Sequence, residues 1–210
     1  MRLLHLSDVH GTPMGQEVLP RLVRELEVDA VVLTGDITHF GPPEYASELA
    51  SSCDVPMLAV LGNCDPPEVA DALAEAGARV LHGRGDVLGG LKFFGLGGLV
   101  GGGVHAGLKL SEEEARRILM GSGKVDVLLT HVPPYGILDE VASLHIGSRG
   151  IREAVRALRP RFHLFGHVHE ARGVLQSTTI FVNPGPFKDG FYAFLDASSA
   201  AVKLLREEGF

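Results

Sequence analysis

The chain has 210 residues, 45% of them apolar, and a net charge of -7 from 19 basic and 26 acidic side chains. This length can bury a sufficient core as one domain, residues 1–210, without disulfides or a structural metal. The two cysteines are too few for a disulfide scaffold, which fits a reducing cytosol. The acidic balance argues against non-specific binding to nucleic acids or anionic membranes. We therefore expect a cytoplasmic protein.

Two further patterns argue against a membrane protein. The N-terminal apolar run is interrupted by His5 and Asp8, so it lacks the pattern of a signal peptide. The longest uncharged stretch, residues 93–108, has 16 residues and includes seven glycines. It is too short and too rich in glycine for a membrane-spanning helix. The scarcity of asparagine, glutamine, cysteine and methionine is typical of a thermophilic source.

The N-terminal part alternates short apolar runs with helical patterns, which predicts βαβ units and a parallel sheet. The apolar runs are almost uninterrupted, as in strands that are covered on both faces. We predict strands at residues 2–7, 29–34 and 56–61, and helices at residues 16–27, 43–51 and 67–76.

Residues 79–99 contain short strands and glycine turns, and we interpret them as a hairpin-rich insertion. A capping box at Ser111 predicts a helix that ends near Met120, and Ser148 is the predicted N-cap of a helix over residues 149–158. Buried strands are predicted at residues 125–130 and 161–165, and antiparallel strands after them. Two sheets are therefore expected.

Polar side chains that can bind metal follow five of the predicted strands. Ligands in open α/β sheets gather at the carboxyl ends of the strands, so these side chains should lie close together. Glycines beside several of them allow sharp turns and a close approach of the backbone. The set consists of Asp8, His10, Asp36, Asn63, His131, His167 and His169.

The mixed nitrogen and oxygen donors of this set favour divalent transition metals. Seven ligands are too many for one ion and about right for two ions that share a bridging carboxylate. In the pairs Asp8/His10 and His167/His169 the residues are two positions apart. Both side chains of a pair would point to one side if the backbone were extended.

The series Asp8-x-His10, Gly35-Asp36, Gly62-Asn63-x-Asp65, His131 and Gly166-His167-x-His169 resembles the calcineurin-like metallophosphoesterase family. The resemblance extends from Asp8 to His169 and is closest to small bacterial and archaeal phosphoesterases. It implies a four-layer α/β/β/α sandwich with two mixed sheets. It also implies that the protein binds two divalent metal ions, for which Mn²⁺ is the first candidate and Fe, Zn or Ni are alternatives. Matching the blocks implies that Asp8, His10 and His169 hold one ion, that Asn63, His131 and His167 hold the other, and that Asp36 bridges them.

One position departs from the commoner family pattern. Many members carry a histidine after the asparagine, and it is thought to protonate the leaving group, but Cys64 occupies this position here. A thiol is a poor substitute for an imidazole acid near pH 7. We leave open a chemical role for Cys64 or a role as a small buried hydrophobe, and we name His39 and His145 as alternative donors that face the substrate.

The segment from His145 to Gly150 leads into a predicted helix. Backbone N–H groups at a helix start bind phosphate, and Arg149 could add a charge-assisted contact. Ser148 and Arg149 are therefore candidate substrate-binding residues, and the alternative is an ordinary capped loop. By contrast, His5 and His163 lie in predicted strands, so we interpret them as core residues.

We predict a metal-dependent phosphodiesterase or phosphomonoesterase in which a hydroxide held between two ions attacks phosphorus. The expected partner is a small phosphate ester, and the oligomeric state stays open. One alternative is a nuclease of the same superfamily, which we rank lower because the chain lacks a basic patch with interleaved aromatic residues. The other is a non-catalytic scaffold, which the intact set of ligands argues against.

Overall fold

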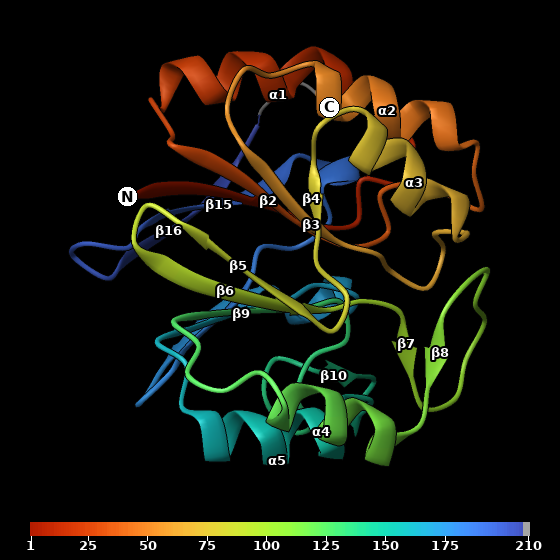
Figure 1. Cartoon of the computed structure of the whole chain (residues 1–210), viewed down its shortest axis with the longest axis vertical. Coiled ribbons are helices and arrows are strands. Elements are labelled where there is room, and N and C mark those ends of the chain that lie inside the picture. The colour runs from red at the N-terminus through yellow and green to blue at the C-terminus, as the bar shows by residue number, and fades with distance from the viewer. Residues whose placement is uncertain (208–210) are drawn as a thin grey trace.

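A computed structural model describes residues 1–207 and contains two six-stranded mixed sheets that pack face to face (Figure 1). Helices cover the outer face of each sheet, so the four layers of the expected α/β/β/α fold are confirmed. The first sheet has the order β16 (Ala201–Arg206), β15 (Phe191–Asp196), β1 (Arg2–Leu6), β2 (Ala30–Thr34), β3 (Met57–Val60) and β4 (Arg79–Val80).

The first sheet is parallel from β1 to β4, and β15 and β16 extend it in the antiparallel sense. All residues of β2 and β3 are buried, which explains their uninterrupted apolar sequence. Leu4 and Leu6 of β1 belong to the outer core beneath the helices, together with Leu19 and Leu22. The helices above this face are α1 (Pro13–Glu25), α2 (Pro43–Ser51) and α3 (Glu68–Glu75).

The second sheet is parallel at its centre and is closed at both edges by antiparallel hairpins. Its order is β13 (Gly173–Gln176), β14 (Ile180–Asn183), β12 (Phe162–Leu164), β9 (Val127–Thr130), β6 (Leu91–Leu96) and β5 (Arg84–Leu88). The outer face of this sheet packs against α4 (Glu112–Met120) and α5 (Arg149–Leu158).

The inner faces of the two sheets share one hydrophobic core. Leu3, Val32 and Leu58 of the first sheet lie in it with Phe93 and Leu129 of the second. Alternate residues of a strand point to opposite faces, so each central strand contributes to this inner core and to an outer one. The carboxyl ends of parallel strands from both sheets meet at one edge, because residues that follow β1, β2, β9 and β12 lie together there.

Predicted helix starts agree with the structure where a capping side chain marks them. Ser111 forms the expected capping box, in which its hydroxyl accepts from the Glu114 N–H, and the side chain of Ser148 accepts from the Ile151 N–H. Helix α1 begins earlier than predicted, at Pro13 instead of Gln16, because proline suits the first turn of a helix.

Residues 79–99 are not an insertion, and this interpretation was wrong. They supply an edge strand of the first sheet, β4, and the hairpin β5–β6 of the second. Strand β6 pairs in parallel with β9, and Phe93 in it belongs to the inner core. The turn at Gly83 therefore separates strands of two different sheets, and the turn at Gly89-Gly90 joins the two strands of the hairpin.

The remaining short elements lie in loops around the strand ends. Two pairs of strands form there, and two single turns of 3₁₀-helix follow β12 and β14. These are β7 (Leu99–Val100) with β8 (Lys109–Leu110), β10 (Glu140–Val141) with β11 (Leu144–His145), η1 (His169–Ala171) and η2 (Phe187–Asp189). Among residues 1–207, no helix has the length and apolar character needed to cross a membrane.

Candidate metal centre

The seven predicted ligands lie in the segments that follow β1, β2, β3, β9 and β12, six of them in loops and His169 at the start of η1. Four come from the first sheet and three from the second, and the structure brings them together where the two sheets meet. The four are Asp8, His10, Asp36 and Asn63, and the three are His131, His167 and His169.

A first cluster consists of Asp8, His10 and His169, whose potential ligand atoms all lie within 4.8 Å of one another. His169 Nε2 is 3.2 Å from Asp8 Oδ1, and His10 Nε2 is 3.9 Å from the same oxygen. Asp8 is buried, while both imidazoles are partly exposed. This cluster therefore faces solvent on its histidine side, as a site that admits a substrate must.

Asp36 lies between this cluster and a second one. Its Oδ2 is 3.9 Å from His10 Nε2, and its Oδ1 is 3.5 Å from His131 Nε2. The backbone N–H of Cys64 donates to Asp36 Oδ1 at 2.7 Å and holds the carboxylate in this position. One oxygen of Asp36 therefore faces each cluster, so the carboxylate lies between the two groups of potential ligands.

The second cluster is formed by Asn63, His131 and His167. His131 Nε2 lies 3.0 Å from Asn63 Oδ1 and 3.1 Å from His167 Nδ1. His131 Nδ1 is 2.8 Å from the carbonyl oxygen of Thr34, which can only accept. His131 therefore carries its proton on Nδ1 when neutral and directs the Nε2 lone pair into the cluster, as a metal-binding histidine does.

The donor atoms of the centre fit a divalent cation. The amide nitrogen of Asn63 donates to the Val104 carbonyl at 3.3 Å, so the amide oxygen faces His131 Nε2, another electron-pair donor. Asp8 Oδ1 is buried, and two imidazole nitrogens lie close to it: His169 Nε2 at 3.2 Å and His10 Nε2 at 3.9 Å. A buried group of carboxylate, amide and imidazole donors of this kind is stabilised by a bound cation.

The backbone at four of the seven positions has a left-handed conformation. The φ angles are 54° at Asp8, 53° at His10, 48° at Asp36 and 69° at His167. Such angles are uncommon for residues other than glycine and gather at functional sites. The backbone of the two pairs is therefore not extended, and the condition under which both side chains of a pair would point to one side is not met.

Two glycines permit the close approach of the loops. A Cβ atom on Gly62 would overlap the carboxylate and the backbone nitrogen of Asp36. A Cβ atom on Gly166 would overlap the Ser7 side chain and lie 2.5 Å from Asp8 Oδ2. No other residue fits these positions without moving a predicted ligand.

The carboxylates determine the protonation of the residues around them. Burial opposes ionisation of Asp8, but the hydrogen bond from His169 and the nearby charge of His131 hold the pKa of Asp8 well below its usual range. Burial disfavours protonated His131, yet Asp36 and Asp8 raise its pKa. The hydrogen bond to Asp8 raises the pKa of His169. The same negative potential that attracts these protons favours a metal cation.

The other two imidazoles are neutral near pH 7. Burial lowers the pKa of His10 despite the nearby Asp36. Burial and the adjacent His131 lower the pKa of His167 to about 4. Neutral imidazole is the form that binds metal, so both residues are ready to coordinate an ion without losing a proton.

Cys64 and His39 lie beside the first cluster. Potential ligand atoms of His10, His39 and Cys64 are within 4.8 Å of one another, and the rings of His10 and His39 are 5.4 Å apart. Cys64 is buried, and burial together with Asp36 raises the pKa of its thiol well above the usual range. A thiol in this environment keeps its proton. His39 is exposed to solvent.

His145 is held by a buried carboxylate that the sequence did not reveal. Asp139 is 1% exposed, and its Oδ1 lies 2.8 Å from His145 Nδ1. The other oxygen of Asp139 accepts from the N–H groups of Gly136 and Gly147. Because a carboxylate only accepts, His145 donates through Nδ1 and keeps Nε2 free.

The structure gives Ser148 a position different from the one expected for a substrate contact. Ser148 is buried, and its hydroxyl donates to Glu112 while accepting from the Ile151 N–H as a helix cap. The Arg149 guanidinium stacks on the Tyr135 ring, 4.0 Å from its centroid. The burial and capping of Ser148 agree with the alternative interpretation of a capped loop, while Arg149 is exposed and its contact with substrate stays a prediction.

Two residues of the site region had no predicted role. Asp65 is fully buried and accepts from the N–H groups of Ile37, Thr38 and Gly62, so it fixes the loops that carry Asp36 and Asn63. Its place in the Gly-Asn-x-Asp motif was a signal that could have revealed this role. The backbone N–H of Lys188 donates to the Asp8 carbonyl, and its positive charge opposes protonation of His10 and His169.

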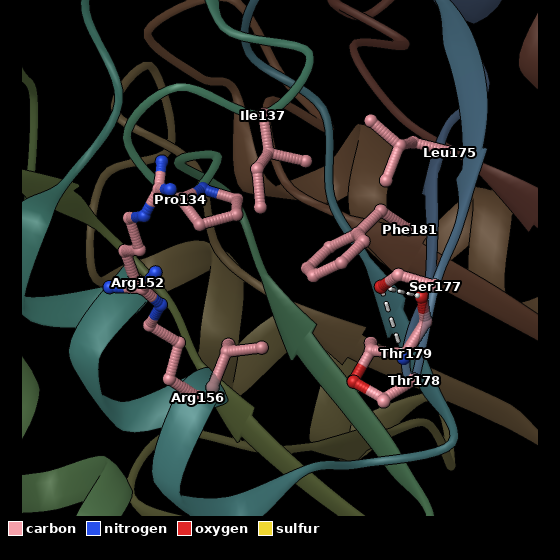
Figure 2. A pocket seen from close by; sticks show the side chains of 10 residues that line it. Pro134, Ile137, Arg152, Arg156, Leu175, Ser177, Thr178, Thr179 and Phe181 are labelled. Carbon is pink, nitrogen blue, oxygen red and sulfur yellow. Dashed lines mark hydrogen bonds between the residues drawn. The ribbon is translucent and has the colours of Figure 1, made fainter.

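A groove opens beside the second cluster, and a separate cavity lies on the second sheet. A groove of about 330 Å³ contains Asn63 and His167 in its wall. A second cavity, of about 200 Å³, lies between α5 and the β13–β14 hairpin (Figure 2). Arg152, Phe181 and Leu175 line the second cavity, and none of its ten lining residues belongs to the predicted ligand set.

Comparison with known proteins agrees with this fold and site. The model of the calcineurin-like phosphoesterase family matches residues 1–171. An uncharacterized protein of Methanocaldococcus jannaschii is 32% identical over 200 residues, which cover 89% of this chain and 88% of that protein.

Solved structures share the architecture. The crystal structure of TT1561 of Thermus thermophilus superposes with a TM-score of 0.80 at 19% identity and covers 98% of both chains. An archaeal phosphodiesterase superposes with a TM-score of 0.63 at 15% identity, covering 99% of this chain and 100% of its own.

The two sheets and the cluster of acidic and histidine ligands define a metallophosphoesterase. The chain belongs to the calcineurin-like phosphoesterase family. Membership supports metal-dependent hydrolysis of phosphate esters, and the candidate ligand groups support divalent metal binding.

Proposed function

We propose that the protein hydrolyses small phosphate esters at a dinuclear centre, with Mn²⁺ as the first candidate metal. The observation that carries this proposal is the position of Asp36, whose two oxygens face His10 of one cluster and His131 of the other. Asp8, His10 and His169 would hold one ion, and Asn63, His131 and His167 the other. When bound, the ions supply Lewis-acid stabilisation of phosphoryl charge and lower the pKa of water.

The protein side chains have three tasks in this proposal. The ligands orient the ester at the solvent-facing edge of the centre, since His10 and His169 are partly exposed. Lys188 supplies a cation beside the first cluster for the anionic oxygens of the ester. Asp65 and Gly62 hold the loops of Asp36 and Asn63 at the distance that the shared carboxylate requires.

We assign protonation of the leaving group to His145. Cys64 is unsuited to this task because its pKa is far too high for an acid near pH 7. The contact with Asp139 fixes the His145 ring and leaves Nε2 free to donate once the ring is protonated. His145 lines a hollow of about 440 Å³ together with Glu170 and Ala171, the two residues that follow His169, and this supports a position near the first cluster.

The proposed function is tested by metal analysis of the purified protein and by Mn²⁺-dependent hydrolysis of 4-nitrophenyl phosphate and bis(4-nitrophenyl) phosphate. We expect two ions per chain and turnover of at least one ester. His167→Ala should lower kcat by at least a hundredfold, while His82→Ala, which removes a half-buried imidazole outside the ligand set, keeps activity. Less than one ion per chain after Mn²⁺ loading, with neither ester hydrolysed, would exclude the proposal.

The role of His145 predicts a dependence on the leaving group. A general acid contributes most when the leaving group is basic, so His145→Gln should slow hydrolysis of phenyl phosphate by about 100-fold and of 4-nitrophenyl phosphate much less. Asp139→Asn should show the same pattern with a smaller loss, since it acts through His145. Equal losses on both esters would contradict the assignment and leave the metal centre unaffected.

A further inference from the structure

The groove beside the second cluster carries two large apolar side chains that are exposed to solvent. Val104 is 74% exposed and Ile146 is 45% exposed, and both line the groove together with Asn63 and His167. Exposed apolar side chains that gather around a concave site commonly mark a binding surface. Their position next to two predicted metal ligands links this surface to the centre.

The rest of the groove wall is also uncharged. Besides Asn63 and His167, its lining residues are aliphatic or glycine: Leu99, Val100, Gly102, Gly103, Val104, Val132 and Ile146. The side chains of this wall offer no charged partner to a second phosphate, a carboxylate or an ammonium group. It does offer burial to an apolar group, which is favourable in proportion to the area removed from water.

The loop that carries Val104 is tied directly to the centre. The side-chain amide of Asn63 donates to the Val104 carbonyl at 3.3 Å, and the backbone N–H of Ala106 donates to the Asn63 carbonyl at 2.7 Å. Asn63 therefore positions the apolar wall as well as its own amide oxygen. An ester whose phosphoryl group lies at the second cluster has its organic group beside this wall.

We propose that the groove binds an uncharged, apolar organic group of the phosphate ester, of the size of an aromatic ring. The groove volume of about 330 Å³ accommodates such a ring. This inference rests on the proposed function and adds a substrate class to it: aryl or similarly apolar phosphate esters, in preference to nucleoside di- and triphosphates and nucleic acids, whose further phosphates would face an uncharged wall.

The test measures binding of two phosphonates that differ only in the organic group. Calorimetry on the Mn²⁺-loaded protein gives the Kd of phenylphosphonate and of methylphosphonate, neither of which is an ester that can be hydrolysed. We expect phenylphosphonate to bind about tenfold more tightly because its ring is buried in the groove. In the double variant V104S/I146S the ratio of the two Kd values should fall to about two.

Leu175→Ser is the matched control. Leu175 is 40% exposed and lines the cavity of Figure 2, which contains none of the predicted ligands, so this variant should keep the tenfold ratio. If the double variant fails to fold, two single variants replace it. These are Val104→Thr, which keeps the shape of the side chain, and Ile146→Ser. Each should lower the ratio by part of the full effect.

The outcomes separate this inference from the proposed function. Equal Kd values for the two phosphonates, in a protein that hydrolyses esters with Mn²⁺, would overturn the inference alone. A ratio that falls in Leu175→Ser and persists in V104S/I146S would place the ring in the other cavity and would also overturn it. Absence of Mn²⁺-dependent binding and of ester hydrolysis would overturn the proposed function and the inference together.

Discussion

His163 is fully buried in the second sheet, where its Nε2 lies 2.9 Å from the hydroxyl of Thr130. It packs between Phe165 and Phe181, with ring centroids 4.9 Å and 5.9 Å away. Burial lowers the pKa of His163 to about 3, so the folded protein holds this ring neutral. His5, which contacts Thr34 in the first sheet, has the same burial and a pKa lowered to about 3.

These lowered pKa values predict a loss of stability in acid. In the unfolded chain a histidine titrates near pH 6.5, so between that pH and about pH 3 the unfolded state binds a proton that the folded state does not. The stabilisation is complete above pH 6.5 and is lost as the pH falls. Within this pH range, each such histidine should contribute about 1.4 kcal/mol per pH unit to the slope of the unfolding free energy against pH.

The measurement is urea unfolding of the metal-free protein from pH 7 to pH 4. His163→Leu removes the titrating group, while the Thr130 hydroxyl keeps its bond to the Val132 carbonyl. We expect the slope of unfolding free energy against pH to fall by about 1.4 kcal/mol per pH unit in the variant. An unchanged slope would mean that His163 is protonated in the folded state.

Helices α4 and α5 are joined at their first turns by one carboxylate. Glu112, the first residue of α4, accepts from the Ser148 hydroxyl and from the Gly150 N–H at the start of α5. Ser148 also caps its own helix through the Ile151 N–H. This arrangement satisfies N–H groups at a helix start that would otherwise lack partners, and it connects two helices of one outer layer.

We therefore expect Ser148→Ala to lower the unfolding free energy by about 2 kcal/mol, because it removes a cap and a charge-assisted bond to Glu112. Ser111→Ala, at the more exposed cap of α4, should cost about 1 kcal/mol. Urea denaturation of both variants measures the difference. A tenfold loss of kcat/KM in Ser148→Ala with unchanged stability would favour a substrate contact instead.

The candidate centre joins the two halves of the molecule. Asp8, Asp36 and Asn63 belong to loops of the first sheet, and His131 and His167 belong to loops of the second. Metal binding would therefore hold the two sheets together at an edge that otherwise concentrates buried carboxylates. A ligand that binds only the folded state stabilises it by mass action.

Metal removal should accordingly lower the thermal stability. At a free Mn²⁺ concentration about 100 times the Kd, the stabilisation is about 2.7 kcal/mol, which corresponds to a Tm about 5–10 °C above that of the protein in EDTA. Asp36→Asn should remove most of this difference because the shared carboxylate is lost. A Tm that does not respond to millimolar Mn²⁺ would contradict the centre.

Much of the fold was predictable because its signals are local. Helix α5 begins and ends where its serine cap and apolar periodicity predict. Residues 79–99 were misinterpreted because hairpin strands look alike whether they form an insertion or belong to two sheets. Asp139 was missed because an isolated aspartate in a loop has no pattern, and only its burial beside His145 reveals its role.

The sequence by itself determined which residues can bind metal, and it showed that they follow buried strands. Both could be predicted because strand periodicity and the chemistry of side chains are properties of short segments. Only the tertiary structure decided that Asp36 lies between two clusters, that Asp8 and His167 have left-handed backbone, and that an apolar groove opens beside Asn63. These features arise where two sheets distant in sequence share one core. Their packing, unlike the strand pattern, depends on contacts that no single segment encodes.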